Sequence, residues 1–134
     1  MSNLPDTKLA VITWISGHPS LPGGVSVSGA VPDDLASAMP LVAVYRPPGS
    51  GPDDGHRWDR TALHFQTWAA TEKTAFNTAN AVFDIVHEMV GAGDVGGAVV
   101  SVTETSAGVG SMPDPGYPDY HRYVFTVTVK ARNP

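Results

Sequence analysis

The chain has 134 residues, of which 42% are hydrophobic and 16% charged, and 13 acidic against 8 basic side chains give a net charge of −5. This length predicts a single domain over residues 1–134, with a core that needs no metal or disulfide. The absence of cysteine excludes a disulfide framework, a thiolate metal site and a cysteine nucleophile. The acidic balance disfavours sequence-specific nucleic-acid binding, and no segment has the pattern of a membrane span or a secretory leader, so we expect a soluble protein.

The predicted elements begin with a short helix over residues 8–16. Its Pro-Asp-Thr opening is typical of a helix start, although several side chains that follow favour strands. Further along the chain we predict a short edge strand, a single helical turn and a strand, at residues 25–27, 33–38 and 41–46.

The strongest pattern lies between residues 62 and 90. Alternating side chains predict a strand over 62–69, with Leu63 and Phe65 on the face opposite Trp68. Thr71 then begins an amphipathic helix that lies with one face on the sheet. The side chains predicted to face the sheet are Phe76, Ala79, Phe83, Val86 and Val90.

Two further strands are predicted at residues 98–103 and 122–130. The set predicts an α+β fold, with an antiparallel or mixed sheet of four to five strands and with the long amphipathic helix and the short N-terminal helix packed on one face. The connections at residues 47–59 and 104–118 are rich in glycine and proline, and loops of this length are usually functional or disordered.

The sequence carries no complete catalytic or metal-binding motif. His87-Glu88 lacks the second histidine of a zinc-protease helix, because residue 91 is glycine. One alternative to turn-forming roles is a loose metal site formed by His56 with Asp53, Asp54 and Asp59. The other is an acid–base cluster formed by Asp114, Asp119 and His121 near Ser111. We therefore predict no catalytic residue, no metal and no cofactor.

Both predicted loops carry the residue types that dominate protein interfaces. Arg57 and Trp58 in the first loop, and Tyr117 and Tyr120 in the second, are predicted partner contacts. Packing of each side chain against its own loop is the alternative. Trp58 could also stack on a nucleic-acid base, but the net charge favours a protein partner.

The order of these elements resembles that of the tail terminator, or tail completion, proteins of long-tailed bacteriophages. Three segments carry the likeness: MPLVAVYR, the passage from HFQTWA to FDIV, and the ending from PDPGY to RYVFTV. The likeness spans nearly the whole chain. The insertion at residues 47–59 departs from the family pattern, so the resemblance implies nothing about the contacts of that loop.

The resemblance implies a small protomer that forms a hexameric ring, caps the tail tube to end its elongation, and joins the tail to the head–neck assembly. It places the protein at the tail–neck junction of the virion, assembled in the host cytoplasm. The implied partners are further copies of the chain, the tail tube protein and a head–neck connector protein. Two alternatives remain: another head–tail connector or minor tail protein, or a small α+β enzyme or ligand-binding domain that uses His56, Asp114 or His121.

Overall fold

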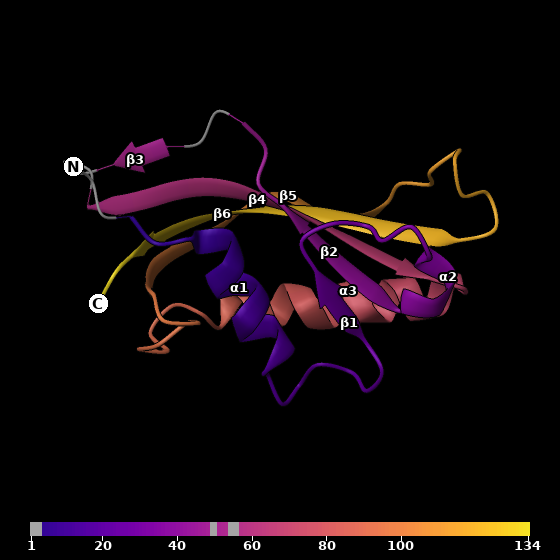
Figure 1. Ribbon diagram of the computed structural model, residues 1–134, viewed down its shortest axis with the longest axis horizontal. Helices are drawn as coiled ribbons and strands as arrows, with labels where there is room; N and C mark the ends of the chain where they lie inside the picture. Colours follow the sequence, from indigo (N-terminus) through magenta and orange to yellow (C-terminus); the bar gives the residue numbers. More distant parts are fainter. Residues whose placement is uncertain (1–3, 49–50, 54–56) are drawn as a thin grey trace.

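The computed structural model describes residues 4–48, 51–53 and 57–134 as a twisted mixed sheet with helices packed against it (Figure 1). The strands are β1 (Ser26–Ser28), β2 (Leu41–Tyr45), β3 (Gly51–Asp53), β4 (Trp58–Ala69), β5 (Val99–Ser111) and β6 (His121–Arg132). The helices are α1 (Thr7–Ser16), α2 (Leu35–Ala38) and α3 (Glu72–His87). The strand order is β1-β2-β4-β6-β5, with β3 paired to the start of β4. Only β1 and β2 run parallel among the described pairs, so the predicted α+β fold is confirmed.

The antiparallel pair of β4 and β6 forms the middle of the sheet. Phe65 lies opposite Phe125 in this register, and their buried rings stack with centroids 4.6 Å apart. Leu63 is buried on the same face, whereas Trp68 lies on the other, because neighbouring side chains of a strand alternate between faces. The predicted orientation of this strand is therefore confirmed.

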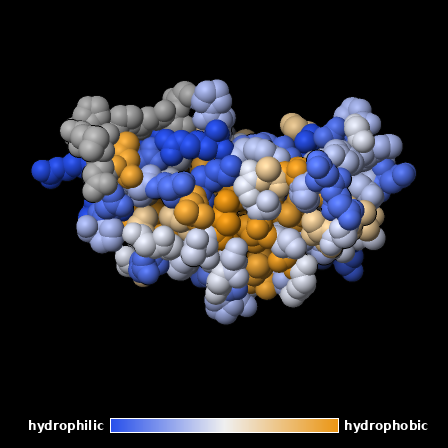
Figure 2. All heavy atoms as spheres, in the orientation of Figure 1, coloured by the Kyte–Doolittle hydropathy of each residue, from blue (hydrophilic) through white to orange (hydrophobic). Residues whose placement is uncertain are grey.

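Helices α1 and α3 cover the same face of the sheet. Asp6 caps α1 by accepting a hydrogen bond from the Leu9 amide, and the Trp14 indole nitrogen donates to the Ile85 carbonyl oxygen of α3 at 2.9 Å. Apolar atoms also gather over the centre of the view in Figure 2, where α1, β1 and β2 lie. The partly buried side chains that extend the core from α1 to β1 are Ile12, Leu21, Val25 and Val27.

The buried face of α3 differs from the predicted one. Phe76 and Val90 are each 45% exposed, so their predicted burial is wrong. The stripe that faces the core consists of Ala75, Thr78, Ala79, Val82, Ile85 and Val86. Small side chains let the helix approach the sheet closely, while Phe83 lies at the flank and contacts the Phe125 ring edge-on at 5.4 Å.

Both predicted loops contain strand. The prediction of a loop over 104–118 is wrong in its first half, because β5 continues to Ser111. The prediction over 47–59 is wrong at residues 51–53 and 58–59, since β3 pairs with β4 and β4 begins at Trp58, while residues 47, 48 and 57 lie outside the strands. Pairing with β6 holds the Gly-, Ser- and Thr-containing second half of β5 extended. Two of the three register shifts in β5 lie in this half, and the third lies near the start of the strand.

An ion pair between the buried Asp59 and the partly buried Arg46 ties the start of β4 to the end of β2 and to α1. Asp59 is 1% exposed and accepts two hydrogen bonds from the Arg46 guanidinium, at 2.6 and 2.7 Å. The Thr7 hydroxyl donates to the same carboxylate. The hydrogen bonds to Asp59 raise the pKa of Arg46, so the guanidinium stays charged.

The N-terminal cap of α3 is formed by Thr71, whose hydroxyl oxygen accepts a hydrogen bond from the Thr74 amide at 3.2 Å. We expect Thr71→Ala to lower the free energy of unfolding by about 1 kcal/mol, because that amide loses its acceptor. Urea unfolding measures the change. Thr71→Ser keeps the hydroxyl and should lose clearly less; equal losses for both variants would contradict the capping role.

Candidate functional site

The sheet face opposite α1 and α3 is the main candidate for partner contacts, because it is largely polar and no long helix of the described residues covers it. An aromatic cluster lies toward each end of this face. Trp58 marks the end near β3, and Trp68 marks the end near α2. All four predicted contact residues belong to these two clusters.

The Trp58 cluster combines an aromatic ring with cations. The Lys130 ammonium and the Arg132 guanidinium each lie 5.4 Å from the centroid of the half-buried Trp58 ring. Arg57 is exposed beside it, and Arg60 makes a loose ion pair with Glu104 at 4.0 Å. Cation–π contacts hold the ring in place while its neighbours remain accessible, which suits an acidic partner.

The Trp68 cluster is more deeply packed. The Tyr117 ring contacts the Trp68 ring edge-on at 5.3 Å and stacks beside Tyr120 at 6.0 Å, and the Arg122 guanidinium lies 5.2 Å from the Trp68 centroid. Trp68 and Leu35 form the buried part of the cluster. The buried Trp68 indole nitrogen has no hydrogen-bond partner among the described residues, so apolar and cation–π contacts hold the ring. Tyr117 and Tyr120 therefore pack against their own protein.

His64 lies between the two clusters, and its Nδ1 is 3.1 Å from the Thr126 hydroxyl. Burial lowers the pKa of His64, and the positive charge of Arg122 lowers it further. The unfolded chain therefore binds this proton more readily than the folded chain. The contribution of His64 to the free energy of unfolding is fully present above the unfolded pKa of about 6.5 and decreases as the pH falls toward the lower folded pKa.

We therefore expect the free energy of unfolding to fall less in His64→Gln than in the wild type as the pH is lowered below about 6.5. Chemical unfolding of wild type and variant across this range measures the difference. His121→Gln is the matched control, because His121 is exposed on a neighbouring strand. If the free energy of unfolding falls with pH equally in the wild type and in His64→Gln, His64 is not the group responsible.

The predicted alternatives for acid–base or metal chemistry find little support in the described residues. Asp114 accepts a hydrogen bond from the Gly116 amide at 2.9 Å and lies 3.6 Å from Arg122, which is the turn-forming role. Asp119 and His121 are exposed. Asp59 is engaged by Arg46, and His56 and Asp54 lie outside the described residues. Within residues 4–48, 51–53 and 57–134, no group of three His, Cys, Asp or Glu side chains could hold a metal.

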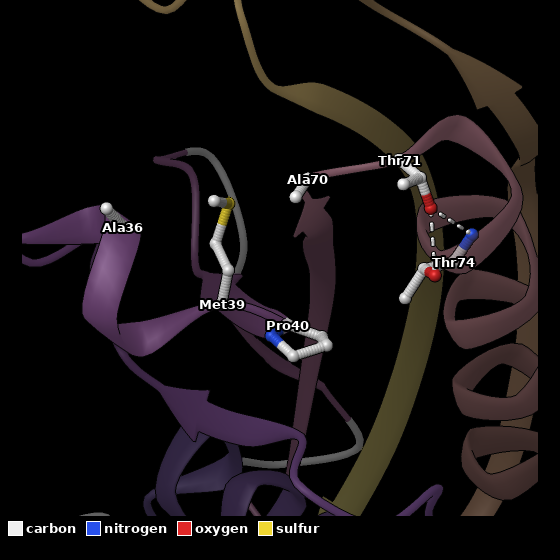
Figure 3. A pocket seen from close by; sticks show the side chains of 6 residues that line it. All are labelled: Ala36, Met39, Pro40, Ala70, Thr71 and Thr74. Atoms are coloured by element: carbon white, nitrogen blue, oxygen red, sulfur yellow. Dashed lines mark hydrogen bonds between the residues drawn. The ribbon is translucent and has the colours of Figure 1, made fainter.

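His87, whose motif lacks the second histidine of a zinc-protease helix, has a structural role. Its Nδ1 and Nε2 lie 3.0 Å from the Thr103 and Thr105 hydroxyls, so it fastens the end of α3 to β5. A hollow of about 270 Å³ lies at the other end of α3. Figure 3 shows its lining residues, which are Ala36, Met39, Pro40, Ala70, Thr71 and Thr74. None of them titrates, so the hollow offers surface for contact and no acid or base.

Comparison with solved structures finds the same fold in a virus-like particle. The chain is similar to one chain of a gene transfer agent virion. The TM-score is 0.59 at 16% sequence identity, and the match covers 94% of each chain; the structure is described as the virion of a native gene transfer agent particle. No family model matches the sequence, and no curated protein matches it. At this identity the likeness establishes a shared fold over nearly the full length of both chains.

The cations of the two clusters were missed in the sequence. Arg122, Lys130 and Arg132 alternate along β6 on the face that holds both tryptophans. Their alternation was readable as the polar face of a strand. Their contact with Trp58 and Trp68 depends on the register between β4 and β6, which the sequence does not state.

No helix in the described residues has the length and hydrophobicity to cross a membrane.

Proposed function

We propose that this protein is a structural component of a phage-like virion, a tail terminator that forms a ring on the tail tube. The observation that carries the proposal is the fold match to a chain of a gene transfer agent virion over 94% of both chains. The resemblance of the sequence to tail terminator proteins supports the same function independently. In this function the protein acts through its surfaces and carries out no chemistry.

The proposed partners are further copies of the chain in a hexameric ring, the tail tube protein and a head–neck connector, at the tail–neck junction. Arg57 and Trp58 are the better candidates for contact with another protein, since Arg57 is exposed and Trp58 is half-buried. Tyr117 and Tyr120 are half-buried on Trp68, so they contribute to contact through the rigid surface that they form. Aromatic and arginine side chains of this kind commonly dominate interface energetics.

Deletion of the gene in the particle-producing host tests the function. We expect full capsids without joined tails, together with tubes of irregular length, because a terminator ends tube growth. Complementation by the wild-type gene should restore tailed particles of uniform length. Tails of normal length and attachment after deletion would contradict the terminator function, whereas normal tails that do not attach would favour a different head–tail connector.

A triple substitution separates assembly from catalysis. His56, Asp114 and His121 replaced together by alanine should still complement the deletion, because none of them has a proposed role in assembly. Electron microscopy of the particles measures tail length and attachment. Complete loss of function in a variant that folds normally, as judged by circular dichroism, would favour an enzyme instead.

A further inference from the structure

The exposed large apolar side chains of the described residues differ between the two ends of the long axis. Phe76 and Met112 lie at the end that holds α2, where α3 begins and β5 ends (Figure 1). Leu9 lies toward the opposite end, in the first turn of α1, and Val90 follows the end of α3. Val102 stands apart on the open face of β5. Single exposed apolar side chains are common on protein surfaces, so the distinguishing feature here is their place at opposite ends of the protomer, which suits a head-to-tail contact.

The patch at the α2 end contains a hollow of about 370 Å³ lined by Glu72, Lys73, Phe76 and Tyr123. The Phe76 and Tyr123 rings meet edge-on at 5.5 Å and form its apolar wall. The Tyr123 hydroxyl donates to the Glu72 carboxylate at 2.9 Å, and this bond raises the pKa of Tyr123. Lys73 has no ion pair or hydrogen bond with the described residues, so it gives the hollow an unpaired positive charge.

The patch at the opposite end is a single protruding side chain with acidic neighbours. Leu9 is 58% exposed, the highest value among the large apolar side chains described. Asp6 caps the same turn, and Gly97 lies in the small hollow beside Leu9. The Asp94 carboxylate accepts a hydrogen bond from the Gly97 amide at 2.9 Å, and both aspartates are exposed. The surroundings of Leu9 therefore carry charge opposite to that of Lys73.

We propose that Leu9 of one copy inserts between Phe76 and Tyr123 of a second copy of this chain, with Asp6 and Asp94 facing Lys73. This contact rests on the proposed function, because it supplies the repeated contact that a ring needs. The hollow is large enough for a leucine side chain. Of its two charged side chains, Lys73 is complementary to the aspartates, while the Glu72 carboxylate is already engaged by the Tyr123 hydroxyl. Since the two surfaces lie at opposite ends of the protomer, each copy can bind two others, and the contact closes into a ring when the rotation allows.

Two other surfaces suit this contact less well. The free edge of β5 is broken by three register shifts, and bulges of this kind discourage pairing with another strand. The basic groups beside Trp58 already interact with its ring. The contact between Leu9 and the hollow disturbs neither the β5 edge nor the cation–π contacts of Trp58.

Sedimentation of the full chain from micromolar to millimolar concentration measures the association. We expect Leu9→Ser and Phe76→Ser each to lower the association constant about tenfold or more, the factor for removing one buried leucine-sized contact. Val102→Ser is the matched control, because it also removes an exposed apolar side chain, but one that lies outside both patches. Circular dichroism checks that each variant folds.

Mixing the two variants tests the head-to-tail pairing. Leu9→Ser keeps the hollow, and Phe76→Ser keeps the protruding leucine, so a mixture should form heterodimers that neither variant forms alone. Lys73→Glu tests the charges without weakening α3, since acidic residues are favourable in the first turn of a helix. It should reduce association, and Asp94→Asn should partly reverse that loss while keeping the acceptor for the Gly97 amide.

The outcomes separate this contact from the proposed function. A wild-type chain that stays monomeric at every concentration overturns both the ring and the contact. A wild-type oligomer that Leu9→Ser, Phe76→Ser and Lys73→Glu all leave intact overturns the contact alone. Loss of association in both serine variants without heterodimers on mixing also overturns the pairing, while heterodimers in the mixture support it.

Discussion

Replacement of Arg46 by methionine is expected to lower the free energy of unfolding by about 3–5 kcal/mol. Methionine keeps an unbranched stem but removes the charge, so among the described residues the buried Asp59 carboxylate keeps the Thr7 hydroxyl alone as its partner. A buried charge that loses its counter-charge is among the most costly defects in a folded protein. Urea unfolding at neutral pH measures the loss.

Two further variants show whether the charge is the cause. Arg46→Met combined with Asp59→Asn removes both charges and should be more stable than Arg46→Met alone, because a neutral amide costs less to bury. Arg60→Met breaks the exposed pair with Glu104, 4.0 Å apart, and should change stability by only about 0.5 kcal/mol. A loss below about 1 kcal/mol for Arg46→Met would contradict the structural role of the Asp59 pair.

Gly96→Ala is expected to destabilise the protein by about 3 kcal/mol. Gly96 has φ of +56°, and a Cβ there would lie 2.8 Å from the Ala10 Cα of helix α1. The left-handed conformation costs about 1 kcal/mol for alanine, and the overlap with rigid helix backbone adds the rest. Thermal and urea unfolding both report the change.

Gly97→Ala separates the two contributions. Gly97 has φ of +90°, yet a Cβ there would meet nothing within 4 Å. This variant should lose about 1 kcal/mol, from backbone conformation alone. Equal losses at the two positions would contradict the close approach of residue 96 to α1, since backbone strain would then account for both.

The hydrophobic patterns predicted most of the fold because they depend on local periodicity. The alternation in 62–69 placed Leu63 and Phe65 on the core face, as observed. The pattern in α3 was less informative, because two adjacent helical stripes are both apolar and only contact with the sheet selects Ala75 and Val82 over Phe76. The second half of β5 was missed because its Gly, Ser and Thr residues are held extended by pairing with β6.

The candidate site was predictable only in part. Residue type alone indicated partner contact for Arg57, Trp58, Tyr117 and Tyr120. The packing of Tyr117 on Trp68 depends on the path of the chain after Ser111, which residue type does not specify. The pairing of Asp59 with Arg46, 13 positions away, likewise depends on strand register. Such contacts join segments distant in the chain, and no local pattern specifies them.

A cryo-electron microscopy reconstruction of the particle that carries this protein would show where the protein lies and how its copies contact one another. We expect six copies of this fold in one ring where the tail tube meets the neck, with the α2 end of each copy against the α1 end of the next. Density for this fold elsewhere in the particle, or a junction ring built from a different fold, would contradict it.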